Sequence, residues 1–443
     1  NADGLSADAA ASADVRQTLR NRARYEVANN SYAKGIVLTL ANDCVGTGPR
    51  LQLLTEDPDI NHIVETAFAD WAREIRLAEK LRTMRMAKAT DGEAFALLTG
   101  NPVLRSPVKI DAQLVEADRI TNPALRMADD TAVDGIQFDR HGNPRQYLVL
   151  RQHPGQTSFP STVDAFDLVP VGSMIHWFRP DRAGQHRGVP EITPALPLFA
   201  QLRRYTLAVL GAAETAADFA AVLFTDAPAS GEAAAVEPMD IVELEKRMAT
   251  VLPDGWKLGQ IKAEQPGTTY GEFKRELLNE IARCLNMPFN VAAGNSSGYN
   301  YASGRLDHQT YFKSIRVEQA DCNSVVLDRI FAAWLSEARL LRDFTFLRGI
   351  DALPHQWFWD GTEHVDPAKE ASAQATRLSN NTTTLATEYA RQGKDWETEL
   401  RQRAKEKQLM KELGLSEAQT QPEQPSQDDE EDDTDVEDQR QAA

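Results

Sequence analysis

The feature that most constrains this chain is a long apolar stripe at helical spacing near its middle. Its members recur at successive gaps of 4, 3, 4, 3, 4 and 3 residues, and they are Leu198, Leu202, Tyr205, Val209, Ala212, Ala216 and Phe219. A seven-residue apolar repeat is typical of a helix that packs along another helix. Alanines and Gly211 surround the stripe, so a neighbouring helix can approach closely. The pattern leaves open whether that neighbour belongs to the same chain or to a second copy.

Half of the negative charge lies in one segment. Residues 421–443 hold ten carboxylates against Arg440 alone, a net charge of −9 out of −18 for the whole chain. A segment with so few apolar residues cannot offset its ordering entropy by burial. We therefore expect residues 416–443 to form a disordered acidic tail. Residues 1–420 carry the other −9, which gives no sign of the basic face that a sequence-specific reader of duplex DNA usually has.

Motifs for the common catalytic chemistries are missing. The sequence contains no P-loop, GxSxG, HExxH or EF-hand pattern. It therefore predicts no cofactor, no metal site and no enzymatic activity. The cysteines Cys44, Cys284 and Cys322 are far apart and are expected to be core thiols in a reducing compartment. The most apolar stretch, residues 205–224, is interrupted by two acidic residues, so we expect no membrane span.

One part of the sequence matches a catalytic pattern. Asp254 and Glu272, separated by seventeen residues, together with Lys274 fit the loose PD…ExK pattern of Mg²⁺-dependent nucleases. That chemistry is usually mounted on adjacent strands, whereas Glu272 and Lys274 open an amphipathic helical pattern. A nuclease is therefore kept as the alternative function.

Periodicity divides the chain into helical and strand-like regions. Helices are predicted at about 25–45, 59–89, 191–224, 239–251, 270–286, 305–342, 366–379, 383–392 and 395–413. Strands are predicted at 94–98, 108–115, 136–138 and 146–150. A helical start that feeds a sheet and is followed by more helices predicts the α+β class.

Several short motifs occur in a consistent order along the chain. They are RARYEVANNSYA (22–33), VGTG (45–48), GIQFDRHGNP (135–144), IHWFRPDRAGQHRGVP (175–190), EIAR with MP (280–288), NYASGR (300–305) and DPAKEA (366–371). Together they resemble the lambda-type family of phage portal proteins, the head-to-tail connectors, over about residues 15–415. The most specific part is the core Arg182-x-x-Gln185-x-Arg187-Gly188-x-Pro190.

The resemblance implies a portal fold: an α/β wing, a helical stem, a small α/β clip, a long wing helix and an α-helical crown, in a ring oligomer. The segments would be a flexible N-terminus (1–14), the wing (15–190), stem helix 1 (191–220), the clip (221–268), stem helix 2 (269–288), a tunnel loop (289–304), the long wing helix with the following segment (305–365), the crown (366–415) and the acidic tail (416–443).

The resemblance also implies a function. Portal rings, typically dodecamers, sit at one capsid vertex and conduct double-stranded DNA during packaging and ejection. The implied partners are further copies of the chain, the terminase motor, a head-tail adaptor, and the major capsid or scaffold protein. The implied location is the virion, and the host cytoplasm during assembly. A minor capsid connector without a channel is the other alternative.

Three sets of residues are the predicted sites. The tunnel loop would touch phosphates and sugars without base readout through Asn295, Ser296, Ser297, Tyr299, Asn300, Tyr301 and Arg305. Brief contacts from the stem would come from Lys274, Arg275 and Arg283. Packing between copies would use Leu198, Leu202, Tyr205, Val209, Ala212 and Ala216.

Overall fold

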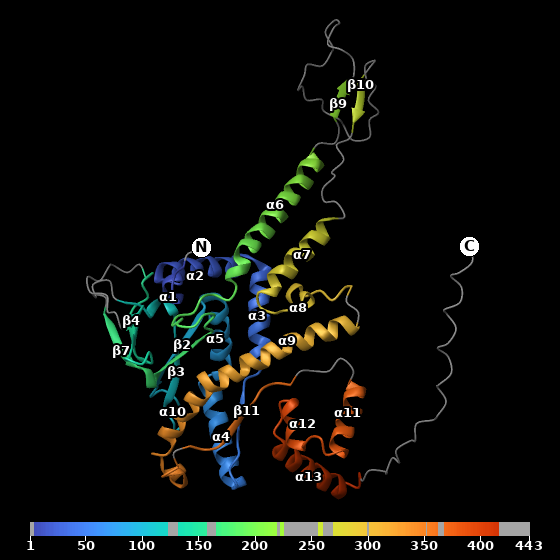
Figure 1. Ribbon diagram of the computed structural model, residues 1–443. Coiled ribbons are helices and arrows are strands. Elements are labelled where there is room, and N and C mark those ends of the chain that lie inside the picture. The colour runs from blue at the N-terminus through green and yellow to red at the C-terminus, as the bar shows by residue number, and fades with distance from the viewer. Residues whose placement is uncertain are drawn as a thin grey trace. The chain divides into compact units, whose positions relative to one another are not determined.

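The computed structural model (Figure 1) describes residues 4–122, 132–156, 165–218, 222–225, 256–259, 269–298, 301–350, 352–361 and 367–415. The chain divides into two compact units, Asn1–Asp360 and Gly361–Ala443. The first unit mixes helices with antiparallel sheets, so the predicted α+β class is confirmed. The helix predicted at 239–251 lies outside the described residues.

The N-terminal part of the first unit is helical. It contains α1 (Ala7–Ala10), α2 (Ala13–Asn29) and α3 (Ser31–Val45). The Asn30 side chain accepts hydrogen bonds from the amides of Tyr32 and Ala33, so it ends α2 and caps α3. Asp8 of α1 bonds the His186 ring at 2.7 Å, a contact that no local sequence pattern signals. The flexibility expected for residues 1–14 as a whole stays a prediction.

The helical pattern predicted at 59–89 is two helices. These are α4 (Pro58–Glu74) and α5 (Leu77–Asp91). Arg76 between them has φ 58°, in the left-handed region. A non-glycine residue seldom adopts that region, so the apolar periodicity continues across a break that it does not reveal.

The strands pair into antiparallel sheets, and all of them except β1 follow α5 in the chain. The strands with their bounds are β1 (Arg50–Leu53), β2 (Glu93–Gly100), β3 (Ile110–Val115), β4 (Ala132–Val133), β5 (Ile136–Phe138), β6 (Pro144–Leu150), β7 (Phe166–Pro170), β8 (Met174–Phe178), β9 (Val222–Thr225), β10 (Trp256–Gly259) and β11 (His355–Phe358). The sheet orders are β3-β2-β8, β4-β5-β6-β7, β9-β10 and β1-β11. The pair β1-β11 joins residues some 300 positions apart, which ties the end of the first unit to its beginning.

The remaining helices of the first unit are α6 (Leu196–Asp218), α7 (Thr269–Arg283), α8 (Phe289–Ala293), α9 (Tyr301–Cys322) and α10 (Asp328–Ala338). A π-helical turn, Asn323–Leu327, joins α9 to α10, so the long helix predicted at 305–342 is interrupted near its middle. Three tryptophan indoles donate to residues around this turn: Trp177 to Asp321 (2.8 Å), Trp359 to Asn323 (3.0 Å) and Trp357 to Asp328 (2.8 Å).

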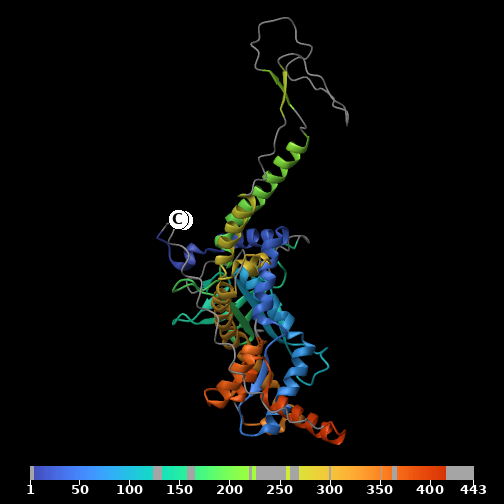
Figure 2. The same ribbon diagram turned by 90° about the vertical axis from the view of Figure 1, so that its right-hand side faces the viewer.

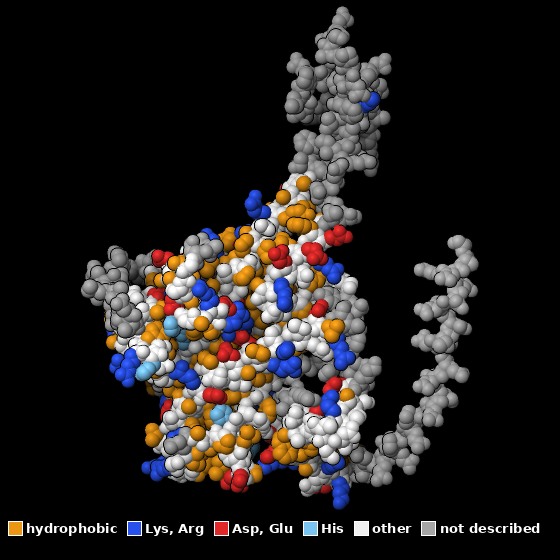
Figure 3. All heavy atoms as spheres, in the orientation of Figure 1, with side chains coloured by type: hydrophobic (Ala, Val, Ile, Leu, Met, Phe, Trp, Pro, Cys, Tyr) orange, Lys and Arg blue, Asp and Glu red, His pale blue; other side chains and the backbone are white. Residues whose placement is uncertain are grey.

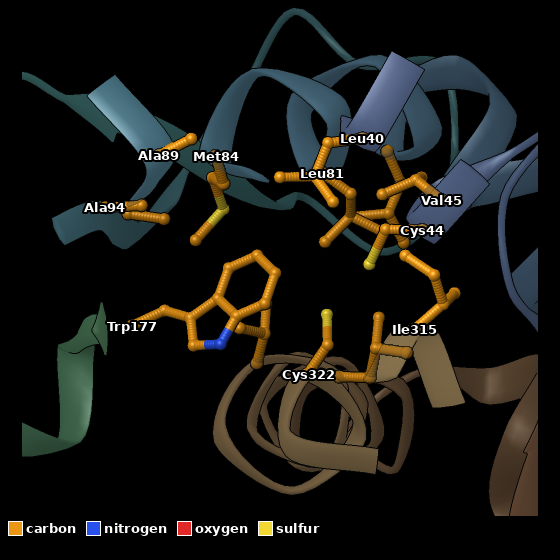
Figure 4. Packing of buried hydrophobic residues seen from close by; sticks show 14 of the residues in the cluster. Leu40, Cys44, Val45, Leu81, Met84, Ala89, Ala94, Trp177, Ile315 and Cys322 are labelled. Carbon is orange, nitrogen blue, oxygen red and sulfur yellow. The ribbon is translucent and has the colours of Figure 1, made fainter. Parts of the chain in front are cut away.

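The main core lies between α3, α5 and α9. Figure 4 shows Leu40 and Cys44 of α3, with Leu81 of α5, facing Ile315 and Cys322 of α9. All five side chains are buried. Burial raises the pKa of the Cys44 thiol to about 12, so this cysteine is an unreactive core group, as expected from the sequence.

The second unit consists of three helices in its described part, α11 (Pro367–Ser379), α12 (Leu385–Arg391) and α13 (Trp396–Glu412). Their predicted ranges were 366–379, 383–392 and 395–413. Arg377 of α11 bonds Glu370 at 2.7 Å and Glu388 of α12 at 3.1 Å, so ion pairs help to join α11 to α12.

Candidate functional site

The most distinctive surface of the first unit is the pair formed by α6 and α7, which lie side by side in Figures 1 and 2. Tyr205 of α6 contacts two rings of α7, Tyr270 with centroids 5.5 Å apart and Phe273 at 4.7 Å. A groove of about 540 Å³ is lined by both helices, including Leu198, Leu277 and Arg283. The apolar stripe therefore has a partner helix in its own chain.

That partner covers only part of the stripe. Leu202 is buried and Tyr205 and Val209 are half-buried, whereas Ala212 is exposed. The side chain of Ala216 lies outside the described residues. On the side of α6 away from the stripe, Leu207 and Leu210 are 61% and 53% exposed, and Phe273 of α7 is 52% exposed. Figure 3 shows hydrophobic side chains on the surface of α6. A single copy thus leaves apolar side chains of both helices uncovered.

The three cations predicted to line a channel lie on α7. The Lys274 ammonium is 5.2 Å from the centre of the Tyr32 ring, and the Arg275 guanidinium is 5.1 Å from that of Phe289. Arg283 donates to the Asn286 side chain at 3.1 Å. These cation–π contacts restrict the positions of the Lys274 and Arg275 side chains.

The loop after α7 is shorter than the predicted range 289–304. Residues 289–293 form α8, and α9 begins at Tyr301. Asn295, Ser296 and Ser297 are exposed, and the Ser297 amide donates to the Asn295 side chain at 2.9 Å. Arg305 is exposed on α9. Tyr299 and Asn300 lie outside the described residues, as does the side chain of Tyr301.

The base of this loop is fixed by polar contacts between three helices. Asn290 of α8 and His308 of α9 are hydrogen bonded at 2.9 Å. The Tyr311 hydroxyl of α9 donates to the Asp43 carboxylate of α3 at 2.8 Å. Burial raises the pKa of Asp43, while its bond with Tyr311 opposes that effect. Contacts among α3, α8 and α9 therefore fix the helices next to the described loop residues 294–298.

A buried ionic cluster lies under the sheet β3-β2-β8. Glu93 of β2 accepts from the Nη2 of Arg187 at 2.6 Å, from the Nη2 of Arg20 at 3.2 Å and from the amide of Gly188 at 3.1 Å. It also bonds His176 at 3.1 Å. Burial opposes ionisation of Glu93, but Arg187 and His176 outweigh it and hold its pKa well below 4.5. Burial lowers the pKa of His176.

This cluster explains the most specific motif of the sequence. Gln185 accepts from the amide of Asp181 at 3.0 Å and donates to the Arg187 carbonyl at 2.9 Å, which shapes the loop. A Cβ on Gly188 would come within 2.0 Å of the Gly92 carbonyl oxygen, so only glycine fits beside β2. The motif serves the fold, and sequence reasoning did not assign it this role. The paired arginine and glycine, Arg187-Gly188, were the signal that could have shown it.

A second buried cluster connects α5 to α9. Arg85 donates to Glu191 at 2.9 Å, and Lys88 donates to Glu318 at 2.6 Å while lying 4.7 Å from the Trp177 ring centre. Burial opposes the charge on Glu318, but Arg85 and Lys88 outweigh that effect and lower its pKa. Both clusters are structural, because every charged member is paired inside the chain.

The nuclease pattern does not come together in the described residues. Glu272 and Lys274 both lie on α7, and Asp254 lies outside the described residues. Within the described ranges, no group of three or more metal-ligating side chains converges. None of the helices in that part of the chain has the length and hydropathy that a membrane span requires.

Two solved structures share this fold. One is a chain from the neck of an empty gene transfer agent (GTA) particle with C6 symmetry, at TM-score 0.53 and 12% identity, covering 86% of this chain and 93% of that one. The other is from the neck of a native GTA particle with C12 symmetry, at TM-score 0.52 and 13% identity, covering 86% and 94%. At these identities the likeness shows a shared fold.

Sequence comparison gives the family. Residues 1–319 match the lambda family of phage portal proteins. A probable portal protein of Halomonas phage phiHAP-1 is 24% identical over 428 residues, which are 90% of this chain and 82% of that protein. Because the family match spans well over half of the 443 residues, the chain belongs to the lambda family of phage portal proteins. The resemblance predicted from the motifs is confirmed.

Proposed function

We propose that copies of this chain assemble into a ring, typically a dodecamer, at one vertex of a capsid, and that duplex DNA passes through the ring during packaging and ejection. The terminase motor and a head-tail adaptor dock on it, and the major capsid or scaffold protein surrounds it. The ring is part of the virion and assembles in the host cytoplasm. Membership in the portal family supports this function, and it does not favour the nuclease alternative.

The observation that carries the proposal is a set of uncovered apolar side chains on α6 and α7. Leu207, Leu210 and Phe273 are each more than half exposed in one copy. Full burial of such a side chain contributes about 1.5–3 kcal/mol, so covering the exposed half of all three contributes roughly 2–5 kcal/mol per contact. A face of one copy that meets a different face of the next closes into a ring when the rotation fits.

Each segment then has a role. The wing is residues 15–190, and the stem is made by 191–220 and 269–288, which include α6 and α7. Residues 221–268 form the clip that faces motor and adaptor, 305–365 the long wing helix and the segment after it, and 366–415 the crown. Residues 289–304 supply the tunnel loop, whose described exposed part is 294–298.

A conduit needs weak, sequence-blind contacts, because several strong phosphate contacts change affinity by orders of magnitude. The charge of −9 on residues 1–420 repels a phosphate backbone. Lys274, Arg275, Arg283 and Arg305 provide the brief attractive contacts, and Asn295, Ser296 and Ser297 provide uncharged ones. The protein itself breaks no bonds, and the energy for transport comes from the motor.

The test is assembly of α6 variants. We expect Leu207→Glu with Leu210→Glu to block ring formation, because two buried carboxylates would lack partners. Leu340→Glu is the control, because Leu340 is 78% exposed and lies outside α6. Sedimentation velocity and negative-stain images measure the outcome. Rings of unchanged size from the double variant would contradict the proposed packing.

A further inference from the structure

The second half of α13 carries a concentration of positive charge. Between positions 401 and 411 one carboxylate, Glu406, stands against five cations, a net charge of +4. The cations are Arg401, Arg403, Lys405, Lys407 and Lys411, and all five are exposed. In a chain with a net charge of −18, this is an unusual local excess.

Among the described residues, no ion pair joins the five cations to a carboxylate; the ion pairs of this unit involve Arg377 and Lys394. Glu406 accepts a hydrogen bond from Gln402 at 2.9 Å, and Glu412 accepts one from Gln408 at 3.2 Å. Glu397 and Glu399 lie four positions before Arg401 and Arg403 and offset part of their charge. Lys405, Lys407 and Lys411 have no carboxylate one turn before them.

The spacing of the cations makes them repel one another. Arg401 and Lys405, Arg403 and Lys407, and Lys407 and Lys411 are each four positions apart, which places like charges next to each other on a helix surface. Each such pair destabilises the helix. An anionic chain lying along this surface would remove the repulsion.

The helix also has apolar side chains without cover. Leu409, Met410 and Leu413 are 54%, 41% and 63% exposed. They lie beside the basic residues near the end of the helix, so this surface combines a row of charges with a small apolar patch.

The sequence supplies a matching anion within reach. Residues 421–443 carry ten carboxylates and one arginine, a net charge of −9. Eight residues, 413–420, separate them from α13 and can span up to about 29 Å. The 17 residues of α13 extend for about 26 Å. The acidic segment can therefore reach every cation on the helix, and its short tether gives a local concentration in the millimolar range.

We propose that the acidic segment 421–443 binds the basic half of α13, residues 401–411, in the same chain. The bound segment neutralises the helix and withholds its cations from other polyanions, including DNA. The inference is independent of ring formation, because it concerns contacts within the second unit.

Hydrogen exchange of α13 tests this binding. The full chain is compared with a chain that ends at residue 420, which keeps all described residues. At 50 mM salt we expect exchange in 401–411 to be about fivefold faster without the segment, because three like-charge pairs lose their counterion. The difference should disappear near 1 M salt, where the Debye length is about 3 Å. Amides of α11 are the internal control. Equal exchange of α13 in both chains would overturn the proposal.

A charge variant and cross-linking make the test specific. In the triple variant Arg403→Gln, Lys407→Gln, Lys411→Gln, removal of the segment should no longer change exchange in α13. Carbodiimide should join the segment to Lys405, Lys407 and Lys411 of the same chain, while Lys34 and Lys313, both exposed in the first unit, stay unlinked. Links spread evenly over all five lysines, or links only between chains in a mixture of isotopically labelled and unlabelled protein, would contradict the proposal. Stronger protection of α13 by duplex DNA in the full chain than in the shortened chain would do the same.

Discussion

Substitution of Arg187 by methionine should strongly destabilise the first unit. Arg187 and the Glu93 side chain are 1% and 0% exposed, and the arginine donates to the carboxylate from Nε at 2.9 Å and from Nη2 at 2.6 Å. Methionine fills part of the space but leaves the carboxylate buried without its main counterion. Breaking a buried pair in this way costs about 3–5 kcal/mol, a large part of the 5–15 kcal/mol that stabilise a typical protein.

The measurement is urea unfolding of Arg187→Met, Glu93→Gln and the double variant, followed by near-ultraviolet circular dichroism of the buried tryptophans. Urea is preferred to guanidinium because it leaves ion pairs unscreened. We expect the double variant to cost at least about 2 kcal/mol less than the sum of the single ones, since it leaves no buried charge unpaired. A loss below about 1 kcal/mol for Arg187→Met would refute the assignment of this pair as a structural anchor.

Further predictions concern the same unit. Gly188→Ala should destabilise it by more than about 2 kcal/mol, because the new Cβ meets the Gly92 carbonyl oxygen. Gly35→Ala lies on the exposed side of α3 with open space around its Cβ and should stabilise it by about 0.5–1 kcal/mol. Equal shifts of the melting temperature in the two variants would contradict both predictions. Burial lowers the pKa of His176 below 6.5, so the unfolded chain takes up a proton first and stability should fall as pH drops through about 6.5; His176→Gln should flatten this part of a pH series of urea midpoints, and an unchanged slope would be contrary to it. If the tunnel loop holds packaged DNA against back-slip, deletion of 295–300 should permit ring assembly but reduce retention of the DNA in a nuclease-protection assay. Full retention would count against this role of the loop.

Local sequence patterns predicted most of the elements. The helices α11 to α13 follow their predicted ranges closely, and Thr384 and Asp395 cap α12 and α13. The strands β2, β3, β5 and β6 were also predicted, since their apolar runs are bounded by turn residues. Patterns of this kind depend only on residues close together in the sequence, so they can be recognised without the structure.

Features that depend on distant residues were missed. The break at Arg76 requires a left-handed residue that its own type does not favour. The pairing of β1 with β11 joins segments from opposite ends of the unit, and neither strand is long or strongly apolar. The motif around Arg187 was recognised as specific, but its buried partner Glu93 lies 94 positions away, so a single sequence could not show the pair.

The predicted packing of α6 between copies stays a prediction. The stripe on α6 does meet a helix, as its period indicated, but Tyr205 contacts α7 of the same chain. Leu207 and Leu210 are left exposed, and they lie on the side of α6 away from the stripe. A seven-residue period marks the face that packs best, and it does not say which neighbouring face remains for a second copy.

A cryo-electron microscopy reconstruction of the assembled protein tests the central claim most directly. The account predicts a closed ring around a channel wide enough for duplex DNA, in which Leu207 and Leu210 of one copy are buried against the adjacent copy. Solitary molecules at all concentrations, or a ring in which this face of α6 points to solvent, would contradict it.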